Sequence, residues 1–124
     1  MRVTPKTFDK IVRRAIARLP EEIRGHLNNI VVSVLMRPTR AMRKEAGLAP
    51  GDELLGLFRG VSLMERSVTS PPLYPDTIFL FQRPLEETAG AIEELEEQIE
   101  ITVVHEVAHY IGMDEKRLAE LGYG

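Results

Sequence analysis

The sequence contains no cysteine, so the chain can form neither disulfide bonds nor thiolate metal sites. Histidine, aspartate and glutamate are therefore the strong metal ligands that it can offer. It also lacks any apolar stretch that approaches about 18 residues, the length that suggests a membrane span. The basic N-terminal segment has no uninterrupted apolar core, which a signal peptide requires. These absences favour a cytoplasmic protein that does not associate with membranes.

The sequence has no excess of positive charge either. The formal net charge is −3 and the pI is near 5.6, which argues against nucleic acid as a partner. Hydrophobic residues make up 44% of the chain and charged residues 28%, a balance that is typical of globular proteins and argues against disorder. Because 124 residues suffice for one hydrophobic core and not for two, we expect a single domain over residues 1–124.

The first helix is predicted directly after Thr4, whose hydroxyl can cap it, with Pro5 in the first turn. Pro20 ends the helical pattern, and residues 20–27 predict a shorter helical piece. Between these prolines the apolar residues recur at three- and four-residue spacing: Phe8, Ile11, Val12, Ala15, Ile16 and Leu19.

Three segments predict β-strands, over residues 28–38, 53–60 and 77–84. The first is so rich in apolar β-branched residues that we expect it at the centre of a sheet. Pro84 is expected to stop the third, and a further short strand is expected soon after residue 60. A short helix ended by Gly47 is predicted between the first two strands.

A long helix is predicted from about Glu86 to Ile111. Its first half, up to Glu100, carries seven glutamates and one narrow apolar stripe, which is typical of a helix with a solvated face. After Glu100 the apolar residues cover several faces, so we expect this half to be buried together with the polar residues inside it.

The buried half contains the motif H-E-x-x-H within ITVVHEVAHYIGMDE, residues 101–115. Helical spacing puts His105 and His109 on one face with Cβ atoms about 5–6 Å apart, and two such imidazoles can bind one zinc ion. Glu106 can lie beside the metal and accept a proton from a bound water, as in zinc metalloproteases. A hydrogen-bonded His–Glu cluster without metal is the alternative that this pattern leaves open.

A catalytic zinc usually has a third protein ligand. Gly112 can end the helix in a left-handed conformation and turn the chain back toward the metal. The metzincin pattern H-E-x-x-H-x-x-G-x-x-H/D then places the third ligand at Glu115. Asp114 is the alternative ligand, or it caps a final short helix over residues 114–122. The third histidine, His26, is expected at the surface and away from this site.

These motifs resemble the small bacterial "minimal zincin" family, metzincin-like zinc metallopeptidases that were formerly grouped as a domain of unknown function. The resemblance follows the order of elements over most of the chain. It is strongest in LLGLFRGVSLMERS, YPDTIFLFQRPLE and HEVAHYIGMDEKRLAELG. It implies an α+β, minimal zincin-like fold, with a small mixed β-sheet backed by helices and a long active-site helix near the C-terminus.

The resemblance also implies the roles of the site residues. His105 and His109 would be zinc ligands and Glu106 the general base. Glu115 stands where the family pattern has Asp or His, which is a departure because glutamate is longer by one methylene group.

The expected function is that of a zinc-dependent, metallopeptidase-like hydrolase with Zn²⁺ as cofactor. A zinc-bound water attacks a peptide carbonyl, and Glu106 takes its proton and passes it to the leaving amine. We expect a peptide or small protein as substrate, held along a sheet edge at residues 53–60 or 61–66. Tyr74, Tyr110 and Tyr123 are unranked candidates to stabilise the transition state. The alternative function is a non-catalytic metal-binding or protein-interaction module with the same fold.

Overall fold

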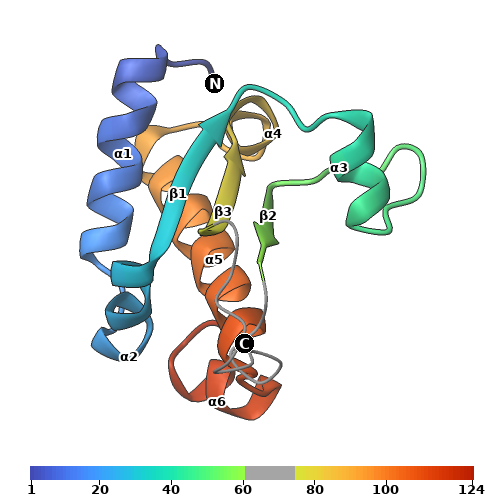
Figure 1. Cartoon of the computed structure of the whole chain (residues 1–124). Helices are drawn as coiled ribbons and strands as arrows, with labels where there is room; N and C mark the ends of the chain where they lie inside the picture. The colour runs from blue at the N-terminus through green and yellow to red at the C-terminus, as the bar shows by residue number, and fades with distance from the viewer. Residues whose placement is uncertain (61–74) are drawn as a thin grey trace.

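A three-stranded mixed sheet lies at the centre of the computed structural model, which describes residues 1–60 and 75–124 (Figure 1). Strand β1 (Ile30–Leu35) runs parallel to β3 (Asp76–Phe81), and β2 (Gly56–Arg59) pairs with the other side of β3 in antiparallel orientation. The mixed sheet and its helices confirm the predicted α+β class. The strand expected soon after residue 60 lies outside the described residues.

The prediction that the first strand is central was wrong. The strand order is β1-β3-β2, so β3 is the central strand and β1 lies at an edge of the described sheet. Val31 of β1 is accordingly 48% exposed, whereas Ile78 and Leu80 of β3 are fully buried. The composition of β1 could not reveal this, because apolar β-branched residues suit both edge and central strands and only long-range pairing decides between them.

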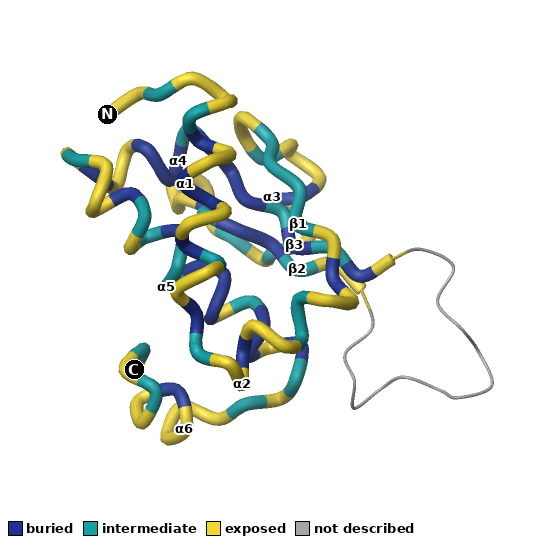
Figure 2. The backbone as a smooth tube through the Cα atoms, turned by 90° about the vertical axis from the view of Figure 1, so that its left-hand side faces the viewer, coloured by how far each residue is buried: buried dark blue, intermediate teal, exposed yellow. Residues whose placement is uncertain are grey.

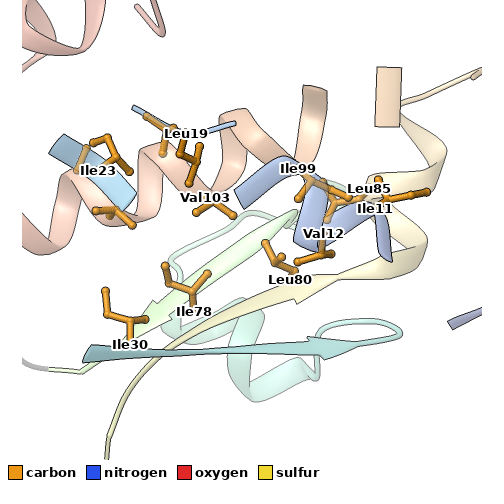
Figure 3. Close-up of a cluster of buried hydrophobic side chains, with 14 of the residues drawn as sticks. Ile11, Val12, Leu19, Ile23, Ile30, Ile78, Leu80, Leu85, Ile99 and Val103 are labelled. Carbon is orange, nitrogen blue, oxygen red and sulfur yellow. The ribbon is translucent and has the colours of Figure 1, made fainter. Parts of the chain in front are cut away.

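Helices cover one face of the sheet and form the main core with it. Figure 3 shows Ile30, Ile78 and Leu80 of the sheet pointing toward side chains of the helices. The helices that face them are α1 (Pro5–Ala17) and α5 (Ile92–Ile111), which pack against each other as well. Alternation along β3 turns Phe81 to the opposite face, where it joins a smaller cluster with Met42 of α3 (Arg40–Glu45).

The helix boundaries near the N-terminus follow the predicted chemistry. Thr4 caps α1 by accepting a hydrogen bond from the Thr7 amide, with an N–O distance of 3.1 Å, and Pro5 is the first helical residue. The shorter piece is α2 (Glu21–Arg24) followed by the 3₁₀ helix η1 (Gly25–Asn29). Within the described residues, no helix has both the length and the apolar character that crossing a bilayer requires.

The long helix predicted from Glu86 is instead two helices, α4 (Gln82–Glu87) and α5, separated by residues 88–91. Strand β3 has already ended at Phe81, so Pro84 does not stop a strand. It lies in the first turn of α4, where a proline is tolerated because the amide hydrogen there has no intrahelical partner. Gly90 in the break was the one local sign of this interruption.

The prediction that all the glutamates lie on a solvated face was wrong for Glu86, because only 1% of this residue is exposed. Its Oε2 accepts hydrogen bonds from the Val3 amide (2.9 Å) and from Gln82 Nε2 (3.0 Å), and its Oε1 accepts one from Arg83 Nη1 (2.6 Å). Burial by itself would raise the pKa of Glu86, but these hydrogen bonds outweigh it and hold the pKa below its ordinary value. The carboxylate thus ties the segment before α1 to α4.

We expect Glu86→Gln to lower the free energy of unfolding at about pH 7 by about 1–3 kcal/mol, because an amide cannot satisfy three donors as a carboxylate does. A depressed pKa stabilises the folded state above the unfolded-state pKa, and this contribution is lost as the pH falls through the lower, folded-state pKa. The difference between wild type and variant should therefore shrink on acidification. Urea unfolding at a series of pH values measures it, and parallel curves would contradict this assignment.

We also expect Gly56→Ala to destabilise the fold, by about 1–3 kcal/mol, because β2 and α5 are in close contact here. A Cβ atom at Gly56 would lie 2.6 Å from Thr102 Cγ2 and 3.1 Å from the Phe79 carbonyl oxygen. Thr102→Ser removes that methyl group and keeps the hydroxyl that donates to the Gln98 carbonyl. In thermal unfolding the double variant should be more stable than Gly56→Ala alone; equal or lower stability would exclude this clash as the cause.

Candidate active site

The second half of α5 is buried on one side and open on the other. Val103, Val104, Val107 and Ala108 are buried as predicted, and Figure 2 shows buried and exposed positions alternating along this helix. His105 and His109 are exposed, however, and Glu106 is half-buried. The expectation that the whole motif is buried was therefore wrong, and the histidines can be reached from solvent without any rearrangement of the core.

Gly112 ends α5 as predicted. It adopts a left-handed conformation with φ of +71°, and the following Met113 amide donates to the Ala108 carbonyl with an N–O distance of 2.9 Å. Asp114 then caps α6 (Glu115–Glu120) by accepting a 2.8 Å hydrogen bond from the Arg117 amide. The chain thus reverses directly after the motif and brings a short helix next to its end.

Glu106 is held by the sheet. Its Oε2 accepts a hydrogen bond from the Phe58 amide of β2, with an N–O distance of 3.1 Å. Burial raises the pKa of Glu106 above its usual value of 4.5, although His109, the Phe58 amide and His105 each pull it down. The carboxyl group is therefore fixed in place, electrostatically coupled to both imidazoles, and easier to protonate than an ordinary glutamate.

The Phe58 amide is available to Glu106 because of the register of β2. The Leu55 carbonyl accepts a hydrogen bond from the Phe81 amide across the pair (3.0 Å), and residues of an antiparallel strand face their partner alternately. Gly56 and Phe58 therefore turn their backbone groups away from β3. In the described part of the chain β2 has a partner strand on one side only, so these groups lie on a sheet edge beside the motif.

Aromatic rings pack beside Glu106 on the same face of α5. The ring of Tyr110, one helical turn after Glu106, lies 5.0 Å from the ring of Phe58 between centroids. The ring of His26 meets Tyr110 edge-on at 6.4 Å. His26 is therefore close to the last turn of α5, contrary to the expectation that it lies away from this region, because η1 leads into β1 next to that turn.

The structure brings together His105, Glu106 and His109 on adjacent positions of one helix. It does not bring a third metal ligand to them from the described residues, since residues 1–60 and 75–124 contain no group of three or more His, Asp or Glu placed to hold a metal. Asp114 is engaged as a helix cap and Glu115 is exposed in the first turn of α6. The two imidazoles fit the preferences of zinc, and all three metal ligands stay predictions.

The C-terminal turn supplies contacts that the sequence did not single out. The carbonyl oxygen of Tyr123 lies 3.2 Å from His105 Nε2, and the Tyr123 hydroxyl donates to Glu100 Oε1 at 2.6 Å. Burial and the hydrogen bond to Glu100 raise the pKa of Tyr123 to about 12. The sequence placed Tyr123 among the aromatic candidates, but a backbone contact from a loop leaves no local pattern that could predict it.

H-E-x-x-H on a helix is a pattern that zinc metallopeptidases use, and here that helix lies beside the edge strand β2. The profile of the zincin-like metallopeptidase family matches residues 27–124, which is most of the chain. The chain therefore belongs to the zincin-like metallopeptidase family, as the resemblance of its motifs implied. A search among curated proteins gave no match.

For the metal-free protein we expect the Glu106 carboxyl to titrate above 4.5, and His109→Ala to raise this pKa further because a neighbouring positive charge is lost. The ¹³C chemical shift of the carboxyl carbon as a function of pH measures both values. His26→Ala is the matched control and should leave the Glu106 titration unchanged. A lower pKa in His109→Ala would contradict the electrostatic coupling inferred here.

Proposed function

We propose that this member of the zincin-like metallopeptidase family is a zinc-dependent hydrolase of peptide bonds. In this proposal His105 and His109 are metal ligands and Glu106 is the general base. One observation carries it: the half-buried Glu106 carboxylate is fixed by the Phe58 amide between a sheet edge and two exposed imidazoles. A cluster that served only to stabilise the fold would have no need for both histidines to be accessible.

Zinc, when bound, would polarise the peptide carbonyl and make a water molecule more acidic. We propose Glu115 as the third ligand, with Asp114 as the alternative. Two observations favour Glu115: the Asp114 carboxylate is already used to cap α6, and the left-handed turn at Gly112 returns the chain toward the motif just before Glu115.

Glu106 suits the work of a general base. Its raised pKa brings it closer to neutrality, and an acid–base group works best when its pKa lies near the working pH. The Phe58 amide holds Oε2, and no described residue donates a hydrogen bond to Oε1. Oε1 can therefore accept a proton from water and deliver it to the leaving amine, while Oε2 keeps the carboxylate in position.

We propose that the substrate is an extended peptide that pairs with the outward edge of β2. The Gly56 amide and carbonyl and the Phe58 carbonyl face this edge, whereas the Phe58 amide is already bonded to Glu106. Adding a strand to an exposed edge is a common mode of peptide recognition. Because Phe58 also holds Glu106, a peptide on this edge would lie next to the base. The expected cytoplasmic localisation stays a prediction.

We expect the purified protein to bind about one equivalent of zinc, and His109→Ala to weaken zinc binding by more than about 100-fold because a ligand is lost. His26→Ala should bind zinc as the wild type does. Glu115→Ala should weaken binding more than Glu120→Ala, the matched change in the same helix. Metal analysis and chelator competition measure these affinities. A wild type that takes up no added zinc would refute the proposed metal site.

Glu106→Gln should keep its zinc and hydrolyse peptides about 10²–10⁴-fold more slowly, because the amide cannot accept the proton. Cleavage of a library of unstructured peptides by zinc-loaded protein, read by mass spectrometry, gives the substrate and the rate. The control is Glu97→Gln, a matched change at an exposed position of α5. Zinc binding by a wild type whose cleavage equals that of Glu106→Gln would favour the alternative, a non-catalytic metal-binding module.

A further inference from the structure

Helix α3 and the loop that follows it form a surface hollow that the proposed mechanism does not use. The hollow has a volume of about 560 Å³ and is lined by Arg40, Arg43, Lys44, Leu48, Ala49 and Pro50. The three cationic residues share one face of α3, because residues three and four positions apart are neighbours on a helix. The loop contributes the apolar residues, and none of the six is aromatic. Positive charge and apolar surface thus meet in one hollow.

The positive charge of this hollow is not neutralised within the described part of the chain. Residues 37–44 contain four cationic side chains and no acidic one, although the whole chain carries a net charge of −3. Arg40 and Lys44 are exposed, and neither forms an ion pair with an acidic residue of ranges 1–60 and 75–124. The adjacent carboxylate, Glu45, is bound to Arg59 instead. Two positive charges are therefore available to an anionic group from outside.

The hollow has a defined position relative to β2. Arg59, the residue after Phe58, binds both carboxylate oxygens of Glu45, with Nη2–Oε1 and Nε–Oε2 distances of 2.9 and 3.3 Å. Arg43 Nη2 donates to the Asp52 carbonyl at 2.6 Å, which ties the loop to α3. These contacts fix α3 and its loop to the strand that also holds the proposed general base.

The hollow and the motif lie toward opposite ends of β2. In Figure 1 α3 stands on the β2 side of the sheet, and the chain passes from its loop into the start of the strand. Glu106 is bonded to Phe58, nearer the end of the strand. A polypeptide that lies on the outward edge of β2 and starts beside the motif therefore continues toward α3.

The chemistry of the hollow suits an acidic polypeptide segment. Carboxylates of such a segment can pair with Arg40 and Lys44, while an apolar side chain of the same segment contacts Leu48 and Ala49. Nucleic acid fits less well. Proteins that bind single strands usually stack the bases on aromatic rings, and duplex binding relies on neutralising many phosphates. The hollow offers no aromatic ring and two unpaired cations.

We propose that the α3 hollow binds an acidic segment of a polypeptide partner, and that this partner is the substrate, held by residues to one side of its scissile bond. The assignment of the partner as the substrate rests on the proposed function. The binding of the acidic segment needs neither zinc nor hydrolysis.

The test removes the charges of the hollow and measures binding directly. Arg40→Ala/Lys44→Ala is compared with Lys6→Ala/Lys10→Ala, a matched pair of exposed cations at the same spacing on α1. Ala49→Glu places a negative charge in the hollow, and Ala49→Gln adds the same bulk without charge. The probes are an unstructured peptide rich in glutamate and leucine, its counterpart with glutamine in place of glutamate, and a short single-stranded DNA. Fluorescence anisotropy gives the affinities for zinc-free protein, and circular dichroism confirms that each variant is folded.

We expect the wild type to bind the acidic peptide more tightly than its glutamine counterpart or the DNA. Arg40→Ala/Lys44→Ala should bind it about 5–20-fold more weakly, because two exposed ion pairs are lost, and added salt should reduce the difference. Lys6→Ala/Lys10→Ala should bind as the wild type does, and Ala49→Glu should bind more weakly than Ala49→Gln. With zinc-loaded protein, Arg40→Ala/Lys44→Ala should raise KM for acidic peptides and leave kcat unchanged, because contacts away from the scissile bond stabilise substrate and transition state alike.

Three results would overturn the inference and leave the proposed function intact. The first is a wild type that binds the acidic peptide no better than its glutamine counterpart. The second is equal loss of binding in the α3 and α1 double variants, because charge at any place on the surface would then suffice. The third is tighter binding of the DNA than of the peptide, which would assign the hollow to another class of partner. Binding of the acidic peptide as expected by a protein that takes up no zinc and cleaves no peptide would refute the proposed function and leave the binding site established.

Discussion

The close contact between β2 and α5 is the constraint on which the rest of the structure depends. A glycine at position 56 lets the strand approach Thr102 of the helix, and two residues later the Phe58 amide reaches Glu106. The hydrogen bond to Phe58 uses a backbone donor that an edge strand would otherwise leave to solvent. One contact therefore satisfies one donor of the sheet edge, fixes the carboxylate and sets the distance between sheet and motif.

The charges around Glu106 follow from that contact. Half-burial disfavours the ionised carboxylate, and the two imidazoles together with the Phe58 amide offset part of this cost. The histidines remain exposed because α5 turns its apolar residues to α1 and the sheet and leaves the His105–His109 side uncovered. Such an arrangement leaves a fixed carboxylate beside two imidazoles that solvent can reach.

Much of the fold could be predicted from local patterns. The cap at Thr4, the helical period that follows it, the left-handed turn at Gly112 and the cap at Asp114 each depend on a few neighbouring residues, and each was confirmed. The errors arose where distant segments decide. The edge position of β1, the break between α4 and α5, and the burial of Glu86 all result from packing partners that local patterns do not reveal.

The sequence by itself determined the family, the helix that carries H-E-x-x-H, and the pairing of His105 with His109 on one face, because these follow from residue types at helical spacing. The tertiary structure decided which way the motif faces, which donor holds Glu106 and which backbone atom meets His105. It also decided that the described residues bring no third metal ligand to the histidines. These features depend on contacts between α5 and segments about 20 to 50 residues away, Tyr123 and Phe58, and only the folded chain brings such segments together.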